Sequence, residues 1–80
     1  RERLAETLLL LKEIYGLESD DSTLNISLTR EDLANIAGTA IETVIRLLSE
    51  FRKEKLIEIA GKKIRIINSD KLFHTAHLFE

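Results

Sequence analysis

An α+β fold is predicted by two patterns that follow one another in this 80-residue sequence. The first is a pair of helical segments that meet at Gly38 with almost no residues between them. The second is a pair of alternating apolar segments on either side of Gly61, typical of a β-hairpin. Two helices joined by a tight glycine turn form a helix-turn-helix, and a hairpin directly after them forms a wing. The sequence therefore predicts a winged helix-turn-helix, with a three-helix core and a small antiparallel sheet.

Length and composition indicate a single small cytoplasmic domain. Eighty residues correspond to one domain, covering 1–80. Cysteine is absent, which excludes disulfides, iron–sulfur ligation and thiol nucleophiles in this chain. No apolar run is long enough to cross a bilayer, and no signal-peptide pattern opens the sequence. Methionine is also absent and the sequence begins at Arg1, so we expect a fragment of a longer protein.

The net charge of −2 does not by itself indicate a nucleic-acid partner. Charge is unevenly distributed, however. Residues 1–29 carry three basic and six acidic side chains, whereas residues 30–71 carry nine basic and seven acidic ones. A case for nucleic-acid binding must therefore depend on the local placement of charges in the middle of the chain.

Residues 1–16 show the periodicity of a helix that ends at Gly16. One apolar face carries Leu4, Leu8, Leu11 and Tyr15, and a second stripe carries Leu10, Ile14 and Leu17. Two stripes predict burial on more than one side. The following segment LESDDST contains two adjacent aspartates but no EF-hand spacing, so we expect a solvated loop.

The segment TLNISLT, residues 23–29, alternates apolar and polar side chains and predicts a short half-buried strand. The first helix of the helix-turn-helix then begins at Thr29, which forms a predicted capping box with Asp32. Gly38 ends this helix because positive φ carries no steric cost for glycine. Ala34 must be small where the two helices cross, and Val44 packs under the corner.

The second helix is predicted to begin at Thr39, with Thr39 and Glu42 as a second capping box, and to fade near Lys55. Its core face carries Val44, Leu47, Leu48 and Phe51.

The hairpin is predicted to have a two-residue type II′ loop, Gly61-Lys62. This loop sets a register in which Ile59 faces Ile64, Ile57 faces Ile66 and Glu58 faces Arg65. Ser69 or Asp70 is expected to cap a short last helix, which contains Leu72, Phe73, Ala76 and Phe79.

Two successive motifs together resemble the C-terminal domain of the Crp/Fnr transcription regulators. They are LTREDLANIAGTAIETVIRLL and, after it, LIEIAGKKIRI. RLAETLLLL resembles the helix that opens that domain, so the resemblance covers nearly the whole chain. It implies a bacterial regulator whose sensor domain and dimerisation helix precede Arg1. It also implies a homodimer in the full-length protein, a pseudo-palindromic double-stranded DNA operator, and RNA polymerase as a further partner.

In the Crp/Fnr family, the Glu and Arg of the motif ETV-R contact bases of a half-site with a TGA-like core. The matching positions here are Glu42 and Arg46. Two positions depart from the family pattern. Ile41 stands where some members have arginine, which resembles the Fnr-like branch more than the cyclic-AMP branch, and Ile45 stands where a small residue is usual.

The helical wheel independently places a polar stripe opposite the core face of the second helix. This stripe consists of Glu42, Arg46, Ser49 and Lys53. Arginine can bind O6 and N7 of guanine, and glutamate can accept a hydrogen bond from cytosine N4. The alternatives are that Glu42 only closes its capping box, and that Arg46 only forms an ion pair with Glu42 or Glu50.

Further contacts to DNA are expected around this stripe. Ile45 is suited to a thymine methyl group, with partial burial against the first helix as the alternative. Contacts to the DNA backbone are expected from Arg30, Thr39, Thr43, Ser49, Lys53, Lys62 and Lys63. Capping alone also explains the threonines at the helix starts, and an ordinary solvated turn also explains Lys62. Arg65 is expected to be occupied by Glu58.

No enzymatic, cofactor, metal or membrane function is indicated by the sequence. His74 and His77 provide only two ligands for a metal, and the three glycines are too far apart for a phosphate-binding loop. The alternative to sequence-specific DNA binding is a winged helix that binds another protein, which the acidic net charge favours. The sequence does not identify the effector, the operator sequence or the direction of regulation.

Overall fold

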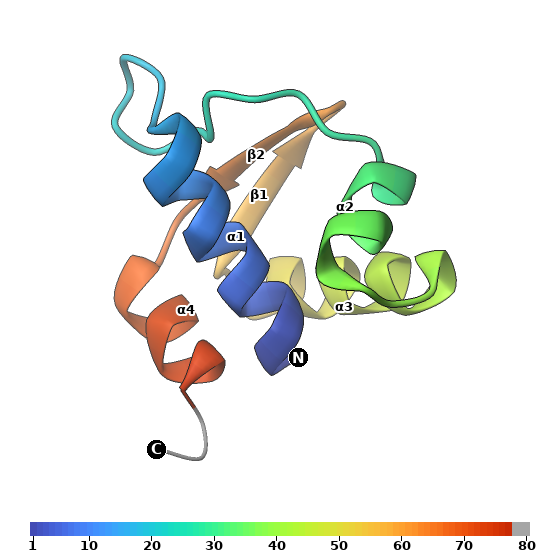
Figure 1. Ribbon diagram of the computed structural model, residues 1–80. Coiled ribbons are helices and arrows are strands. Elements are labelled where there is room, and N and C mark those ends of the chain that lie inside the picture. The colour runs from blue at the N-terminus through green and yellow to red at the C-terminus, as the bar shows by residue number, and fades with distance from the viewer. Residues whose placement is uncertain (78–80) are drawn as a thin grey trace.

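Four helices and one two-stranded sheet make up residues 1–77, the part of the chain that the computed structural model describes (Figure 1). The elements occur in the order α1 (Glu2–Tyr15), α2 (Arg30–Ala37), α3 (Ile41–Lys53), β1 (Ile57–Ala60), β2 (Lys63–Ile66) and α4 (Ser69–Ala76). The order helix, helix-turn-helix, hairpin and helix confirms the predicted winged helix-turn-helix.

Helix α1 crosses the molecule between α4 on one side and the α2–α3 pair on the other (Figure 1). Its first apolar face is buried at Leu4, Leu8 and Leu11, but Tyr15 at the end of that face is half-exposed. The prediction that the second stripe is also buried was wrong, because Leu10 is 49% exposed and Ile14 is 62% exposed. The neighbouring elements leave this side of α1 at the surface, and only Leu17 of the second stripe packs against the core.

The segment at residues 23–29 has the predicted alternation of burial but is not a regular strand. Leu24 and Leu28 are buried, whereas the polar residues between them are exposed. The Leu24 amide donates to the Ile64 carbonyl and the Leu28 amide donates to the Lys62 carbonyl, at 2.9 Å each. The four residue steps from Leu24 to Leu28 therefore span the same length as the two residue steps from Lys62 to Ile64. The mismatch prevents regular pairing, and Thr23 forms an isolated bridge with Arg65 of the hairpin in place of a ladder.

The turn between α2 and α3 has the predicted glycine geometry. Thr29 caps α2, because its side chain accepts from the Asp32 amide and the Asp32 carboxylate accepts from the Thr29 amide, both at 3.0 Å. Gly38 lies in the left-handed region, at φ 69° and ψ 40°. The Thr39 amide then donates to the Ala34 carbonyl at 3.0 Å, as in a Schellman motif.

The second predicted capping box is absent. Helix α3 begins one residue later than predicted, with Ala40 as its N-cap and no side-chain capping bond. The reason is that the Thr39 amide still closes the end of α2. Glu42 consequently occupies the second helical position, and its carboxylate is not used in a capping box.

The hairpin confirms the predicted register: Ile57 pairs with Ile66, Glu58 with Arg65, and Ile59 with Ile64. Gly61 has φ 61°, and Lys62 is not among the residues with positive φ, as a type II′ turn requires. The cap of the last helix was predicted one or two residues too late. The Asn68 side chain accepts from the Lys71 amide at 3.0 Å, so Asn68 is the N-cap of α4. Phe79, which was expected in this helix, lies outside the described residues.

Lys55 takes the left-handed conformation directly after α3, at φ 61°. The Leu56 amide donates to the Phe51 carbonyl at 2.9 Å, which is the helix-ending geometry that glycine normally supplies. We expect Lys55→Gly to raise the free energy of unfolding by about 0.5–1 kcal/mol, because it removes a Cβ that disfavours this conformation. Urea denaturation measures the change.

Lys53→Gly is the matched control, because Lys53 is an exposed lysine in the last turn of α3. Glycine at a helical position should lower stability by about 0.8–1 kcal/mol. If both variants shifted stability in the same direction, the left-handed conformation of Lys55 would not be an energetic feature of the fold.

Candidate nucleic-acid interface

Helix α3 has one buried face and one exposed polar face. The buried face consists of Val44, Leu47, Leu48 and Phe51. The predicted stripe of Glu42, Arg46, Ser49 and Lys53 is exposed along its whole length. Packing of the apolar face against the core therefore determines the orientation of α3 and presents these four side chains together to a partner.

Glu42 and Arg46 differ in their surroundings. The Arg46 guanidinium is 3.0 Å from the Glu50 carboxylate, one turn along α3, and its side chain is 63% exposed. Glu42 lies in the first turn and forms no ion pair within residues 1–77. Of the two alternatives considered for these residues, an ion pair with Glu50 is present for Arg46, and the capping box proposed for Glu42 is not formed.

The tip of the hairpin is tied to the start of α2. The Arg30 guanidinium donates to the Gly61 carbonyl at 3.2 Å, and the Leu28 amide donates to the Lys62 carbonyl. Hydrogen bonds from Thr29 hold the pKa of Asp32 below its usual range, and the nearby positive charge of Lys62 acts in the same direction. The hairpin tip and the first turn of α2 therefore present one continuous surface.

The two wing lysines are not equivalent. Lys62, at the tip, is exposed. Lys63 is half-buried and forms an ion pair of 2.5 Å with Glu18, in the loop after α1. Lys62 is therefore the more accessible of the two for a phosphate, whereas Lys63 already has a carboxylate partner. Arg65 forms the expected pair with Glu58, at 3.0 Å.

The remaining predicted residues flank the stripe. Thr39 and Thr43 are half-buried beside the start of α3. Ile45 is 52% exposed and Ile41 is 36% exposed, so both present apolar surface next to the polar stripe. Ile45 therefore lies at the surface and is not packed away against α2.

A groove between the C-terminal half of α3 and the hairpin adds two basic residues to the predicted ones, Arg52 and Lys55. Its lining includes Ser49, Arg52, Lys53, Lys55, Lys63 and Arg65. Arg52 lies three residues after Ser49, so helical spacing could have identified it. The contribution of Lys55 depends on its left-handed backbone, and no periodicity reports that conformation.

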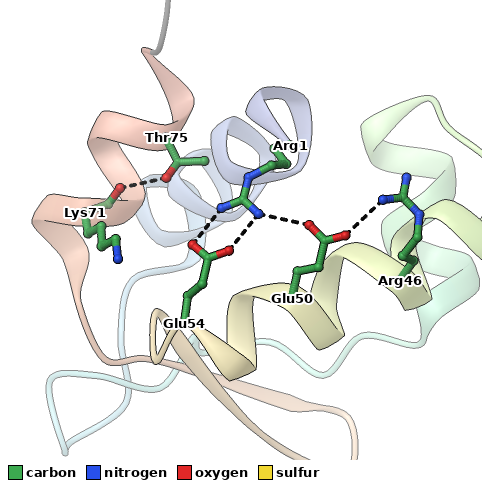
Figure 2. A network of polar contacts seen from close by, with 6 residues as sticks. All are labelled: Arg1, Arg46, Glu50, Glu54, Lys71 and Thr75. Carbon is green, nitrogen blue, oxygen red and sulfur yellow. Dashed lines mark hydrogen bonds and ion pairs between the residues drawn. The ribbon is translucent and has the colours of Figure 1, made fainter.

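An ion-pair network connects the start of α1 to the exposed face of α3 (Figure 2). The Arg1 guanidinium binds the Glu54 carboxylate through two contacts of 2.8 Å and the Glu50 carboxylate through one of 2.9 Å. The hydrogen bond to Glu54 raises the pKa of Arg1, and the same bond lowers the pKa of Glu54. Because Arg1 and Glu54 are 53 residues apart, no local pattern predicts this contact.

Within residues 1–77, His, Cys, Asp and Glu side chains form no group of three or more that could hold a metal. The ring centroids of His74 and His77 lie 6.3 Å and 4.2 Å from that of Phe73. None of the helices described here combines the length and hydrophobicity needed to span a bilayer.

Comparison with known proteins assigns the family. A family model described as a Crp-like helix-turn-helix domain matches residues 2–74. Electron transport regulator A of Shewanella oneidensis is 36% identical over 72 residues, which are 89% of this chain and 29% of that protein. The fumarate and nitrate reduction regulatory protein of Vibrio cholerae is 37% identical over 51 residues, which are 64% of this chain and 20% of that protein.

Solved structures agree with these relatives. A transcriptional regulator of the CRP/FNR family from Thermus thermophilus superposes with a TM-score of 0.83 at 28% identity, over 94% of this chain and 39% of that chain. The chain spans less than a third of the two curated relatives named above. From its helix-turn-helix, its hairpin and these matches, the chain belongs to the family of Crp-like helix-turn-helix domains found in Crp/Fnr-type regulators.

Proposed function

We propose that this domain binds double-stranded DNA sequence-specifically as part of a bacterial Crp/Fnr-type transcription regulator. Helix α3 enters the major groove, where Glu42 and Arg46 contact base edges and Ile45 contacts a thymine methyl group. The hairpin tip and the first turn of α2 lie against the phosphate backbone.

The observation that carries this proposal is the exposed stripe on α3. Glu42, Arg46, Ser49 and Lys53 lie opposite a fully buried apolar face, so a partner meets charged and hydrogen-bonding groups in a fixed arrangement. A helix with this pattern fits the width of a major groove. The relatives are named as regulators, which supports the same assignment.

The operator is proposed to be pseudo-palindromic, because two copies of such a domain in a dimer contact two half-sites about one helical turn apart. Backbone contacts are assigned to Arg30, Thr39, Thr43, Ser49, Lys53, Lys62 and Lys63. We propose that the full-length protein is a cytoplasmic homodimer and that RNA polymerase is a further partner.

Selection of duplexes from a random library tests the proposal. The chain should enrich one short half-site over several rounds, and the selected duplex should bind more tightly than a scrambled duplex at equal salt. If no sequence were enriched and binding stayed at the non-specific level, the domain would instead be a protein-interaction module. The exposed Ile41 and Ile45 would then be its first candidate anchors.

Lys62 is proposed to hold a phosphate without contacting a base. We expect Lys62→Ala to weaken binding to all duplexes similarly and to reduce the slope of log affinity against log salt by about one unit. Gel-shift titrations at several salt concentrations measure both effects.

Lys71→Ala is the matched control for Lys62→Ala, because Lys71 is an exposed lysine on α4, outside the proposed interface. It removes the same charge and should leave the salt slope nearly unchanged. Equal slopes for the two variants would contradict the contact between the hairpin tip and the DNA backbone.

A further inference from the structure

The Glu50 carboxylate lies between two guanidinium groups that come from different parts of the chain. One of its oxygens is 2.9 Å from Arg1 Nη1 and the other is 3.0 Å from Arg46 Nη1 (Figure 2). Both carboxylate oxygens are therefore occupied, and the Glu50 side chain is only 36% exposed. This arrangement leaves Glu50 poorly suited to contact DNA itself and well suited to hold its neighbours.

Arg1 is held from three directions. It forms two hydrogen bonds with Glu54 in addition to its bond with Glu50, and its guanidinium lies 5.2 Å from the centre of the Phe51 ring. Phe51 is fully buried, so this ring is a fixed part of the core. Through Arg1, the position of Glu50 is therefore fixed relative to the core and to the first turn of α1.

Arg46 is the most exposed of the residues in this network. Its side chain is long and 63% exposed, and within residues 1–77 it forms an ion pair with Glu50 alone. A guanidinium group has five N–H donors, so the bond to Glu50 through Nη1 leaves the other donors available to a base edge. A side chain that is already oriented loses less conformational entropy when it binds.

We infer that Glu50 is a positioning residue for base recognition by Arg46, and that Arg1 in turn holds Glu50 in place. The inference rests on the proposed base contact of Arg46. It adds two residues that touch no DNA to the determinants of sequence preference, and it makes the preference depend on the start of α1.

Base discrimination by Glu50 variants tests the inference. The ratio of affinities for the selected duplex and for duplexes substituted at the base pair contacted by Arg46 is measured for the 80-residue chain. Glu50→Gln and Glu50→Ala should each lower this ratio by about two- to tenfold, which corresponds to the cost of ordering one long side chain on binding. Arg1→Ala should lower it in the same direction by a smaller factor.

Glu58→Gln is the matched control, because Glu58 also forms an exposed ion pair of 3.0 Å with an arginine, on the hairpin. It makes the same change of charge and so has a similar electrostatic effect on binding to any duplex. Its discrimination ratio should equal that of the parent. A ratio in the Glu50 variants as high as in Glu58→Gln would overturn the inference.

The order of the Arg46 side chain provides a readout that does not require DNA. In the free chain, the ¹⁵N relaxation of Arg46 Nε should show greater mobility in Glu50→Ala than in the parent and in Glu58→Gln. Unchanged mobility would overturn the positioning role even if base discrimination fell. A parent chain that bound all duplexes equally would instead overturn the proposed function, and the base-recognition role of Glu50 with it.

Discussion

Replacing Arg46 with alanine is expected to lower affinity for the preferred duplex by about 1–3 kcal/mol and to remove the preference at one base pair. The reason is geometric: a guanidinium group can donate two parallel hydrogen bonds to O6 and N7 of guanine, and no other base pair offers the same two acceptors in the major groove. Arg46 lies on the exposed face of α3 with most of its donors available. Gel-shift titration on the selected and substituted duplexes measures the loss.

Two further variants separate base contact from charge. Arg46→Lys keeps the positive charge but loses the planar fork, so it should retain non-specific binding and lose most of the discrimination. Arg52→Ala removes an exposed arginine from the same helix outside the stripe, and it should weaken binding to all duplexes alike. If Arg46→Ala behaved like Arg52→Ala, Arg46 would be a backbone contact and the recognition of bases would fall to Glu42.

Local sequence patterns predicted the parts of the fold that depend on few residues. The two-residue loop at Gly61-Lys62 fixes the strand register by itself, and the register was correct at every predicted pair. The Thr29–Asp32 capping box and the left-handed Gly38 likewise involve interactions within a few residues. These features could be predicted because the chemistry that determines them is contained in the motif.

The predictions were wrong where interactions with another element of the fold determine the local structure. The start of α3 moved by one residue because the Thr39 amide is used by α2. Residues 23–29 do not form a regular strand because the spacing of their amides does not match that of the carbonyls on the hairpin. Helix α1 leaves Leu10 and Ile14 exposed, since periodicity reports which residues share a face but not which faces are covered.

The candidate interface likewise has one part that local patterns predict and another part that depends on contacts between distant residues. The stripe on α3 follows from helical periodicity, and the structure places all four of its residues at the surface. The contact between Glu50 and Arg1 joins residues 49 positions apart, and it requires α1 and α3 to be packed together first. A helical wheel can identify the Arg46–Glu50 pair, but it cannot identify Arg1 as the residue that holds Glu50.

Replacing Ala34 with leucine is expected to lower the free energy of unfolding by about 1–3 kcal/mol. Ala34 is 5% exposed and belongs to the same buried core as Val44 and Leu33. Its carbonyl accepts the amides of both Gly38 and Thr39, so the backbone here cannot shift without disturbing the turn. A larger side chain must therefore push α2 away from its neighbours. Urea denaturation measures the loss, and for a chain of this size each kcal/mol lowers the melting temperature by about 4–8 °C.

Ala40→Leu is the control for this substitution, because Ala40 is exposed at the N-cap of α3 and forms no side-chain capping bond. The same added carbon atoms should change stability there by no more than about 0.5 kcal/mol. Ala34→Leu should also weaken specific DNA binding in conditions where the variant is fully folded, since the angle between α2 and α3 sets how the stripe meets a groove. If Ala34→Leu unfolded at the same urea concentration as Ala40→Leu, the helices would not be in close contact at Ala34, and the small residue would not be what determines the corner of the helix-turn-helix.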